Sequence, residues 1–232
     1  MISFKNYILF LLSLFIASCK VVNPKVDKPS ANENVMALTK SLPKETNTTP
    51  SDTSFVSLKA FSSDFVYDMK YATTANFLKQ AVYDCPECYL RYKTVKSLIE
   101  ANNEFMTKGY KIKLFDCYRP LSIQKKMWQI VSNPIYVADP NKGSIHNRGC
   151  AIDITLVNSN GEELDMGTPF DFFGEESSHN YKNLSEDIKR NRAFLKEVML
   201  KHNFKSFDSE WWHYNLVDGN LEKLANFNWD CN

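Results

Sequence analysis

Residues 144–153 read SIHNRGCAID and contain two side chains that commonly bind metal ions, His146 and Asp153, one on each side of a glycine. From Cys150 to Val157, aliphatic residues alternate with small or polar ones, and this alternation predicts a strand. The aliphatic face of the strand would pack in the core. Asp153 would lie on the opposite face, between neighbours small enough to leave room for an ion. The stretch therefore predicts a core strand that carries part of a metal site.

A second cluster, Glu210-Trp211-Trp212-His213, lies further along the chain. His213 would complete a set of two imidazoles and one carboxylate, which suits zinc and leaves one position open for water. Glu210 would then be the candidate base for that water. Glu210 and His213 would face opposite sides of a flat strand, so both can serve one site only if the backbone bulges or turns near Glu210. The alternative is that the tryptophans are core residues and Glu210 is a solvated strand end.

Arg119 lies in the segment Asp116-Cys117-Tyr118-Arg119-Pro120, which follows a predicted strand and precedes a predicted helix. Its permanent positive charge would suit an oxyanion or a substrate carboxylate. The alternative is an ordinary ion pair with a surface acid.

Composition and charge narrow the class of protein. Of the 232 residues, 44% are hydrophobic and 24% are charged, as in ordinary globular proteins. One domain is expected from residue 54 to residue 232. The first 18 residues hold one lysine and no acidic residue, so the chain that follows has a formal net charge of zero. No basic stripe is visible, so nucleic acid is not expected as a partner, and nothing predicts a protein partner.

The N-terminus has the pattern of a secretion signal. Lys5 precedes the apolar run 7–16, which is too short to span a bilayer as a resident helix. The signal, residues 1–18, ends in small residues before Cys19 and resembles a bacterial lipobox, which implies lipidation of Cys19. Residues 19–53 would form a flexible tether. We therefore expect a membrane-anchored lipoprotein of the bacterial cell envelope, facing the periplasm or the exterior; the alternative is ordinary cleavage that leaves Cys19 free.

Five of the six cysteines follow Cys19, and an exported protein can form disulfides. Cys85 and Cys88 have CxxC spacing, but no second CxxC completes a four-cysteine zinc site. A local disulfide or one longer bridge is expected for them, with at least one thiol unpaired because five is odd. Cys117 and Cys150 are expected to be small buried residues.

Periodicity and turn residues predict the order of elements. Helices are expected over 90–108, 120–131 and 187–202, and strands over 55–71, 110–116, 150–157 and 207–216. These elements favour an α+β fold, a single domain with a mainly antiparallel sheet and helices packed on one side.

Six pieces of sequence stand out between Tyr71 and Tyr214 or beside them: KYATTANF at 70–77, DCYRP at 116–120, SIHNRGCAIDITL at 144–156, MGTPFDFF at 166–173, NRAFLKEVM at 191–199 and EWWHY at 210–214. In these pieces and their order, the chain resembles D-alanyl-D-alanine dipeptidases of the VanX type, which are zinc D,D-peptidases of family M15 in a wider group that includes D,D-carboxypeptidases and the hedgehog N-terminal domain.

The resemblance implies roles for the metal-site residues. His146, Asp153 and His213 would hold one zinc ion. Glu210 would take a proton from the metal-activated water and later deliver it to the leaving amine. Arg119 would stabilise the oxyanion.

The resemblance also implies substrate contacts from Ser144, Asp171 and Tyr71, with Asp171 suited to an ammonium group. The expected activity is hydrolysis of D-alanyl-D-alanine or related short D-amino-acid dipeptides in cell-wall peptide turnover. The segment between Arg119 and His146 is shorter than in some such dipeptidases, so a more open site could admit longer peptides. The alternatives are a zinc D,D-carboxypeptidase or endopeptidase acting on peptidoglycan stem peptides, and a non-catalytic zinc-binding module.

Overall fold

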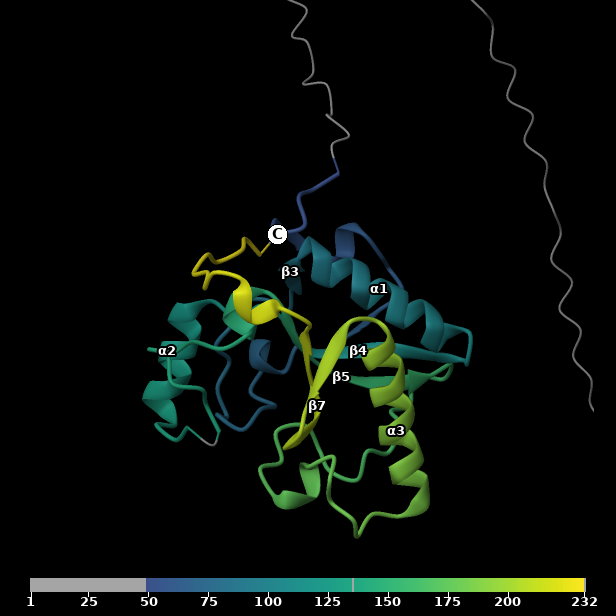
Figure 1. The fold of residues 1–232 in the computed structure, drawn as a ribbon. Coiled ribbons are helices and arrows are strands. Elements are labelled where there is room, and N and C mark those ends of the chain that lie inside the picture. Colours follow the sequence, from purple (N-terminus) through teal and green to yellow (C-terminus); the bar gives the residue numbers. More distant parts are fainter. Residues whose placement is uncertain (1–48, 135, 232) are drawn as a thin grey trace, which may run out of the picture. The chain divides into compact units, whose positions relative to one another are not determined.

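The computed structural model describes residues 49–134 and 136–231 (Figure 1). The predicted signal segment, Cys19 and most of the predicted tether lie outside the described residues. No helix in the described part of the chain is both long enough and apolar enough to cross a membrane.

Ten helices and strands position the site within the described ranges. They are β1 (Phe55–Ser57), β2 (Val66–Tyr67), β3 (Tyr89–Arg91), α1 (Tyr92–Met106), β4 (Tyr110–Asp116), α2 (Leu121–Ile130), β5 (Ala151–Asn158), α3 (Glu186–Lys201), β6 (Phe204–Phe207) and β7 (Glu210–Leu216).

The main sheet has five strands in the order β2-β4-β5-β7-β6. β2 is parallel to β4, and the other three pairings are antiparallel. α1 packs on β4, α3 packs on β6 and β7, and the two helices contact each other. α2 lies apart from them, on the left of Figure 1. The α+β fold with a mainly antiparallel sheet is confirmed.

The predicted elements match the observed ones closely where the pattern is regular. The strand expected over 110–116 is β4, and the three helices begin and end within two residues of the expected positions. Gly109, with φ of 83°, ends the α1 region as predicted. Two of the predicted strands are longer than the observed ones. Segment 55–71 contains two short strands separated by a 3-10 turn, and segment 207–216 holds only the end of β6 before β7 begins.

β5 is the central strand, and both of its faces are buried. Ile152, Ile154 and Leu156 are fully buried in the main core, as the alternation predicts. Full burial of each such side chain stabilises the fold by about 2 kcal/mol. Asp153 and Thr155 on the other face are buried as well, because the loops that form the candidate site cover that face.

Two disulfides connect segments that are distant in sequence. Cys88 is bonded to Cys117 across 29 residues, and Cys85 to Cys231 across 146 residues. Cys150 is buried and unpaired. The expectation for Cys117 as a simple buried residue was therefore incomplete. Cys88 is buried beside the end of β4, whereas Cys85 is partly exposed and faces the C-terminal tail.

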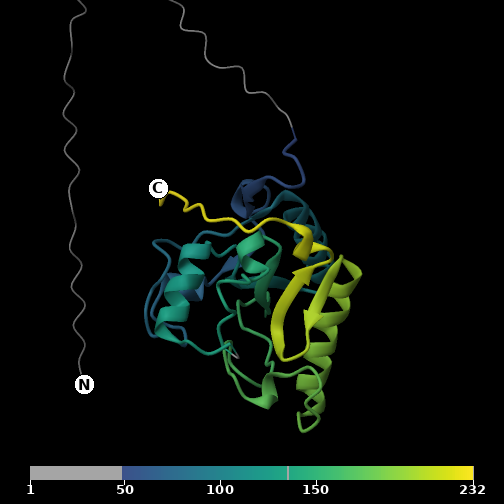
Figure 2. The same cartoon turned by 60° about the vertical axis from the view of Figure 1, so that its left-hand side comes forward.

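The C-terminal tail crosses loops near the site before it reaches Cys231 (Figure 2). The amide of Ala225 donates to the carbonyl of Asn147 at 2.8 Å. The ring of Phe227 stacks on that of Tyr118, with centroids 4.6 Å apart. The tail thus contacts the segment after β4 and the segment that contains His146, and the Cys85–Cys231 bond fastens its end.

Replacing both residues of the outer bridge, as Cys85→Ser/Cys231→Ser, is expected to lower the free energy of unfolding by about 5 kcal/mol, because the bond closes a long loop in the unfolded chain. The Cys88–Cys117 bond closes a shorter loop, for which the same estimate is about 3.5 kcal/mol. Chemical denaturation under oxidising conditions measures both. A loss below about 1 kcal/mol for the outer pair would mean that packing alone holds the tail.

Candidate metal and active site

Sheet register brings three polar side chains into one row. Asp153 on β5 is opposite His213 on β7 and, on the other side, opposite Asp116 on β4. His146 enters from the 3-10 turn His146–Arg148, which precedes β5. Gly149 ends that turn with φ of 70°, and a side chain there would collide with the ring of Phe55, 2.2 Å from the position of its Cβ. The turn from His146 into β5 thus requires glycine.

The backbone irregularity predicted near Glu210 is present. Ser206 pairs with Tyr214, but the next residue of β6, Phe207, pairs with Glu210, so β7 bulges between them. The bulge lets Glu210 and His213 face the same cavity, with Glu210 Oε2 4.0 Å from His213 Nδ1. Trp211 and Trp212 are core residues, each 2% exposed. Glu210 is partly buried and is not the solvated strand end of the alternative.

His146, Asp153 and His213 converge so that one ligand atom from each lies within 4.8 Å of the others. His146 Nε2 is 3.2 Å from His213 Nδ1 and 3.4 Å from Asp153 Oδ2. His213 Nδ1 is 3.0 Å from Asp153 Oδ1. Burial disfavours the carboxylate of Asp153, but the two histidines more than offset this and lower its pKa.

The outer nitrogens of both imidazoles have hydrogen-bond acceptors. His146 Nδ1 donates to the carbonyl of Cys117 at 2.7 Å, and His213 Nε2 donates to Asn215 Oδ1 at 2.9 Å. A neutral imidazole that donates through one nitrogen carries a lone pair on the other. If both rings are neutral, two lone pairs face each other beside the carboxylate of Asp153, and a proton or a metal cation between them relieves the repulsion. The residues present fit a metal ion, with outer partners that orient both rings.

Arg119 is 7% exposed, and its guanidinium is held by buried partners. Its Nη2 and Nε donate to Asp116 Oδ2 at 2.5 and 3.2 Å, and its Nη1 donates to Gln124 Oε1 at 3.0 Å. Asp116 also accepts from the hydroxyl of Tyr83 at 2.7 Å. Burial disfavours the charge of Arg119, but Asp116 outweighs this and keeps its pKa well above the ordinary value. The ion pair of the alternative interpretation exists, but its acid is the buried Asp116 and not a surface residue.

The three expected substrate residues lie in the same region. The hydroxyl of Tyr71 donates to Asp171 Oδ2 at 3.0 Å. Burial, followed by the charge of Asp153, raises the pKa of Asp171 well above its usual range. A carboxyl group in that state would gain stability from a nearby cation. Ser144 Oγ accepts from the amide of His146 at 3.2 Å and so supports the turn that carries this histidine.

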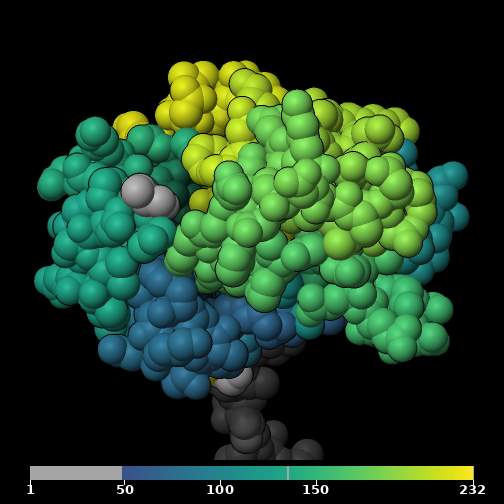
Figure 3. Space-filling model, turned by 90° about the horizontal axis from the view of Figure 1, so that it is seen from below, coloured from purple at the N-terminus to yellow at the C-terminus, as the bar shows by residue number. Residues whose placement is uncertain are grey.

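All eight predicted site residues line one cavity of about 330 Å³. Tyr136 and Phe173, with ring centroids 4.3 Å apart, also line it. Seen from below, the green segment around 166–178 lies against the teal segment around α2 (Figure 3). The lining residues from these two regions are Asp171 and Phe173 in the first, and Pro134, Tyr136 and Ala138, which follow α2, in the second.

The sequence did not predict the three residues that support Arg119, His146 and His213. Asn215 could have been found, because a residue two positions after His213 lies on the same face of a strand. The sequence predicts no partner for Asp116, which lies in the same short segment as Arg119. The carbonyl of Cys117 leaves no signal in the sequence, because every residue has one.

Asp116→Asn is expected to lower the free energy of unfolding by about 3–5 kcal/mol, because the buried guanidinium of Arg119 loses its counter-charge. Urea denaturation measures the loss. The matched control is Asp52→Asn, which removes a carboxylate that pairs with Lys96 at the surface and is expected to change stability little. Equal losses in the two variants would contradict the structural importance of the buried pair.

Comparison with known proteins adds independent information. The Peptidase_M15 family, described as D-ala-D-ala dipeptidase, matches residues 51–228. The D-alanyl-D-alanine dipeptidase of Escherichia coli (strain K12) is 34% identical over 164 residues, covering 71% of this chain and 85% of that protein. The protein of the same name from Enterococcus faecium is 33% identical over 176 residues, covering 66% and 86%.

Solved structures give a weaker likeness. The LdcB LD-carboxypeptidase matches at a TM-score of 0.40 and 20% identity, covering 74% of this chain and 70% of that chain. VanYB in complex with D-alanine-D-alanine matches at 0.38 and 14% identity, covering 56% and 72%. Neither likeness is close enough to assign residues. The family match covers most of the described chain, and on that match the chain belongs to the M15 family of D-ala-D-ala dipeptidases and is a metallopeptidase.

Proposed function

We propose that this protein hydrolyses D-alanyl-D-alanine, or a closely related short D-amino-acid dipeptide, with one zinc ion held by His146, Asp153 and His213. The observation that carries the proposal is the convergence of these three side chains, with Glu210 and Arg119, in one cavity. The names of the relatives, D-alanyl-D-alanine dipeptidases, support the choice of substrate.

Two neutral imidazoles and one carboxylate suit zinc and leave one coordination position for water. A bound zinc ion would supply a Lewis acid that polarises the peptide carbonyl and lowers the pKa of water to about 7. The protein's own contribution is orientation. The Cys117 carbonyl and Asn215 hold the two rings so that their unprotonated nitrogens face inward.

Glu210 is proposed as the group that moves the proton. Burial is the main cause that raises the pKa of Glu210. A raised pKa brings this carboxyl group closer in proton affinity to the water and the leaving amine with which it would exchange a proton. Its carboxylate takes a proton from the attacking water and delivers it to the nitrogen of the leaving D-alanine. The 4.0 Å separation between Glu210 Oε2 and His213 Nδ1 supports a role for Glu210 beside the proposed metal ligands and not among them.

Arg119 is proposed to stabilise the negative charge that develops on the carbonyl oxygen. Three of its N–H groups are engaged by Asp116 and Gln124. A guanidinium has five N–H groups, so two remain for a ligand. Because Asp116 fixes the plane of the guanidinium, these donors need little reorganisation during the reaction.

Asp171 is proposed to bind the substrate ammonium, with Tyr71 holding its carboxyl group and Ser144 contacting the substrate beside His146. The cavity of about 330 Å³ is near the lower end of the range for small-molecule sites. Together with the rim formed by Tyr136 and Phe173, this size favours a free dipeptide over the end of a longer stem peptide.

The deciding experiment measures D-alanine release from D-alanyl-D-alanine and from a stem pentapeptide by the zinc-loaded protein. We expect kcat/KM for the dipeptide to be at least about 100-fold higher, since the pentapeptide cannot present a free ammonium to Asp171. The reverse preference would support the carboxypeptidase alternative. No release from either peptide, with zinc bound, would support the non-catalytic module.

In the same assay, Glu210→Gln is expected to lower kcat by about 10²–10⁴-fold while the zinc content stays the same. Glu163→Gln is the matched control, since Glu163 is an exposed carboxylate paired with Lys113 and lies outside the cavity. Normal turnover by Glu210→Gln would exclude Glu210 as the base.

We also propose that Cys19 is lipidated and anchors the protein in the bacterial cell envelope, where it acts in cell-wall peptide turnover. The lipobox-like signal supports this, as do two disulfides, which are typical of oxidising compartments. Mass spectrometry of the native mature protein should find acyl chains on Cys19, and Cys19→Ala should release the protein from the membrane fraction. An unacylated Cys19 on the native mature protein would disprove the anchor.

A further inference from the structure

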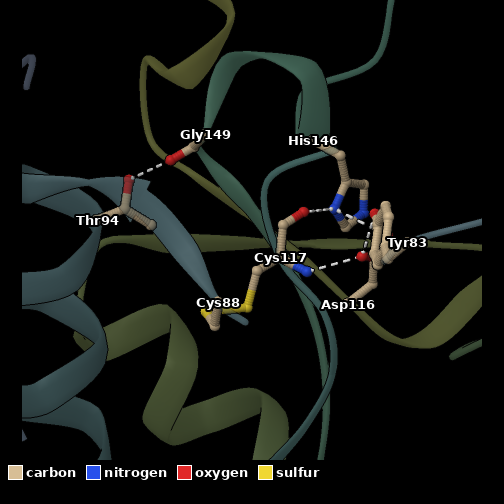
Figure 4. The surroundings of a disulfide bond; sticks show 7 residues. All are labelled: Tyr83, Cys88, Thr94, Asp116, Cys117, His146 and Gly149. Atoms are coloured by element: carbon tan, nitrogen blue, oxygen red, sulfur yellow. Dashed lines mark hydrogen bonds and ion pairs between the residues drawn. A yellow bond between two sulfur atoms is a disulfide. The ribbon is translucent and has the colours of Figure 1, made fainter. Parts of the chain in front are cut away.

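The Cys88–Cys117 disulfide lies directly beside a metal ligand (Figure 4). Both cysteines are fully buried. The carbonyl of Cys117 accepts the hydrogen bond from His146 Nδ1 at 2.7 Å, so the residue that carries one sulfur also orients the imidazole. The metallopeptidase assignment gives no role to this bond.

The direction of the His146 ring depends on that one backbone oxygen. Within the described ranges, the Cys117 carbonyl is the hydrogen-bond partner of His146 Nδ1, and the nearest carboxylate oxygen, Asp116 Oδ2, is 3.7 Å away. A displaced carbonyl would let the ring rotate or change tautomer. Either change would turn the lone pair of His146 Nε2 away from Asp153 and His213.

Strand pairing does not hold the carbonyl in place. β4 ends at Asp116, and its register with β5 already shifts between Leu114 and Asp116. The amide of Cys117 donates to the side chain of Asp116 at 2.9 Å and not to a neighbouring strand.

Two links connect this segment to β3 and the residue before it. The amide of Tyr118 donates to the carbonyl of Tyr89 at 3.0 Å, and the disulfide joins Cys117 to Cys88. The amide of Leu58 donates to the carbonyl of Cys88 at 2.9 Å, which ties that residue to the N-terminal part of the domain. The covalent link therefore joins the end of β4 to a separate, well-packed part of the fold.

We propose that the Cys88–Cys117 disulfide positions His146, and that tight metal binding requires this bond. The inference rests on the proposed role of His146 as a zinc ligand. It also gives a reason why the two cysteines of the CxxC pair bond to different partners and not to each other. Cys88 supports the metal site, and Cys85 fastens the C-terminal tail.

The test compares Cys88→Val/Cys117→Ala, which keeps most of the buried volume, with Cys85→Ser/Cys231→Ser. Zinc Kd is measured by competition with a chromophoric chelator at fixed pH. We expect the Kd to rise about 10–100-fold in the first variant, the range for lost support of a metal ligand, and to change less than about threefold in the second. The second variant opens the longer loop, so general destabilisation would predict the opposite order.

A second measurement uses the wild-type protein and does not depend on folding of a variant. The zinc-loaded protein is treated with a phosphine reductant, and freed thiols are alkylated and located by mass spectrometry while zinc release is followed. With a competing chelator present near the wild-type midpoint, zinc occupancy should stay the same when the Cys85–Cys231 bond opens and should fall when Cys88–Cys117 opens.

Three results would overturn the inference. They are an unchanged Kd in the folded first variant, equal losses in the two variants, and unchanged zinc occupancy against the competing chelator after Cys88–Cys117 has opened. Failure of the wild-type protein to bind zinc is a different result, because it would reject the proposed function itself.

Discussion

The pairing of β5 with β7 is the constraint on which the site depends. It places Asp153 opposite His213, and the pairing of β5 with β4 places Asp116 on the other side. A slip of one residue would turn each side chain to the other face of the sheet and dismantle the site. The buried aliphatic face of β5 prevents such a slip, because Ile152 and Ile154 would lose their place in the core. Core packing and the candidate metal site are thus specified by the same strand.

The second physical feature is a concentration of carboxyl groups in an enclosed space. Asp153, Asp171 and Glu210 line one cavity, and Arg119 already has Asp116 as its counter-charge. The field of this cavity therefore favours cations. A metal ion between the histidines and an ammonium group beside Asp171 would both relieve repulsion that the protein alone leaves in place.

Much of this was accessible from the sequence, for identifiable reasons. The alternation of 150–157 predicted β5 and the face of Asp153, and the spacing of Glu210 and His213 required the bulge that β7 has. The division of segment 207–216 was missed although Asp208 and Ser209, where the chain turns, are typical turn residues, because the apolar and aromatic residues on both sides favour one strand. The pairing of Cys117 was missed because its partner, Cys88, is distant in sequence and closer to Cys85.

The sequence by itself determined which chemical groups are present, the strands and helices that carry them, and the local irregularity near Glu210, because these depend on side-chain type and periodicity over a few residues. Only the tertiary structure decided which groups meet. Asp116 became the counter-ion of Arg119, Asn215 and the Cys117 carbonyl became the partners of the two imidazoles, and the CxxC pair divided between the metal site and the tail. These contacts join segments that are distant in sequence, or use backbone atoms that every residue has, so no local pattern records them.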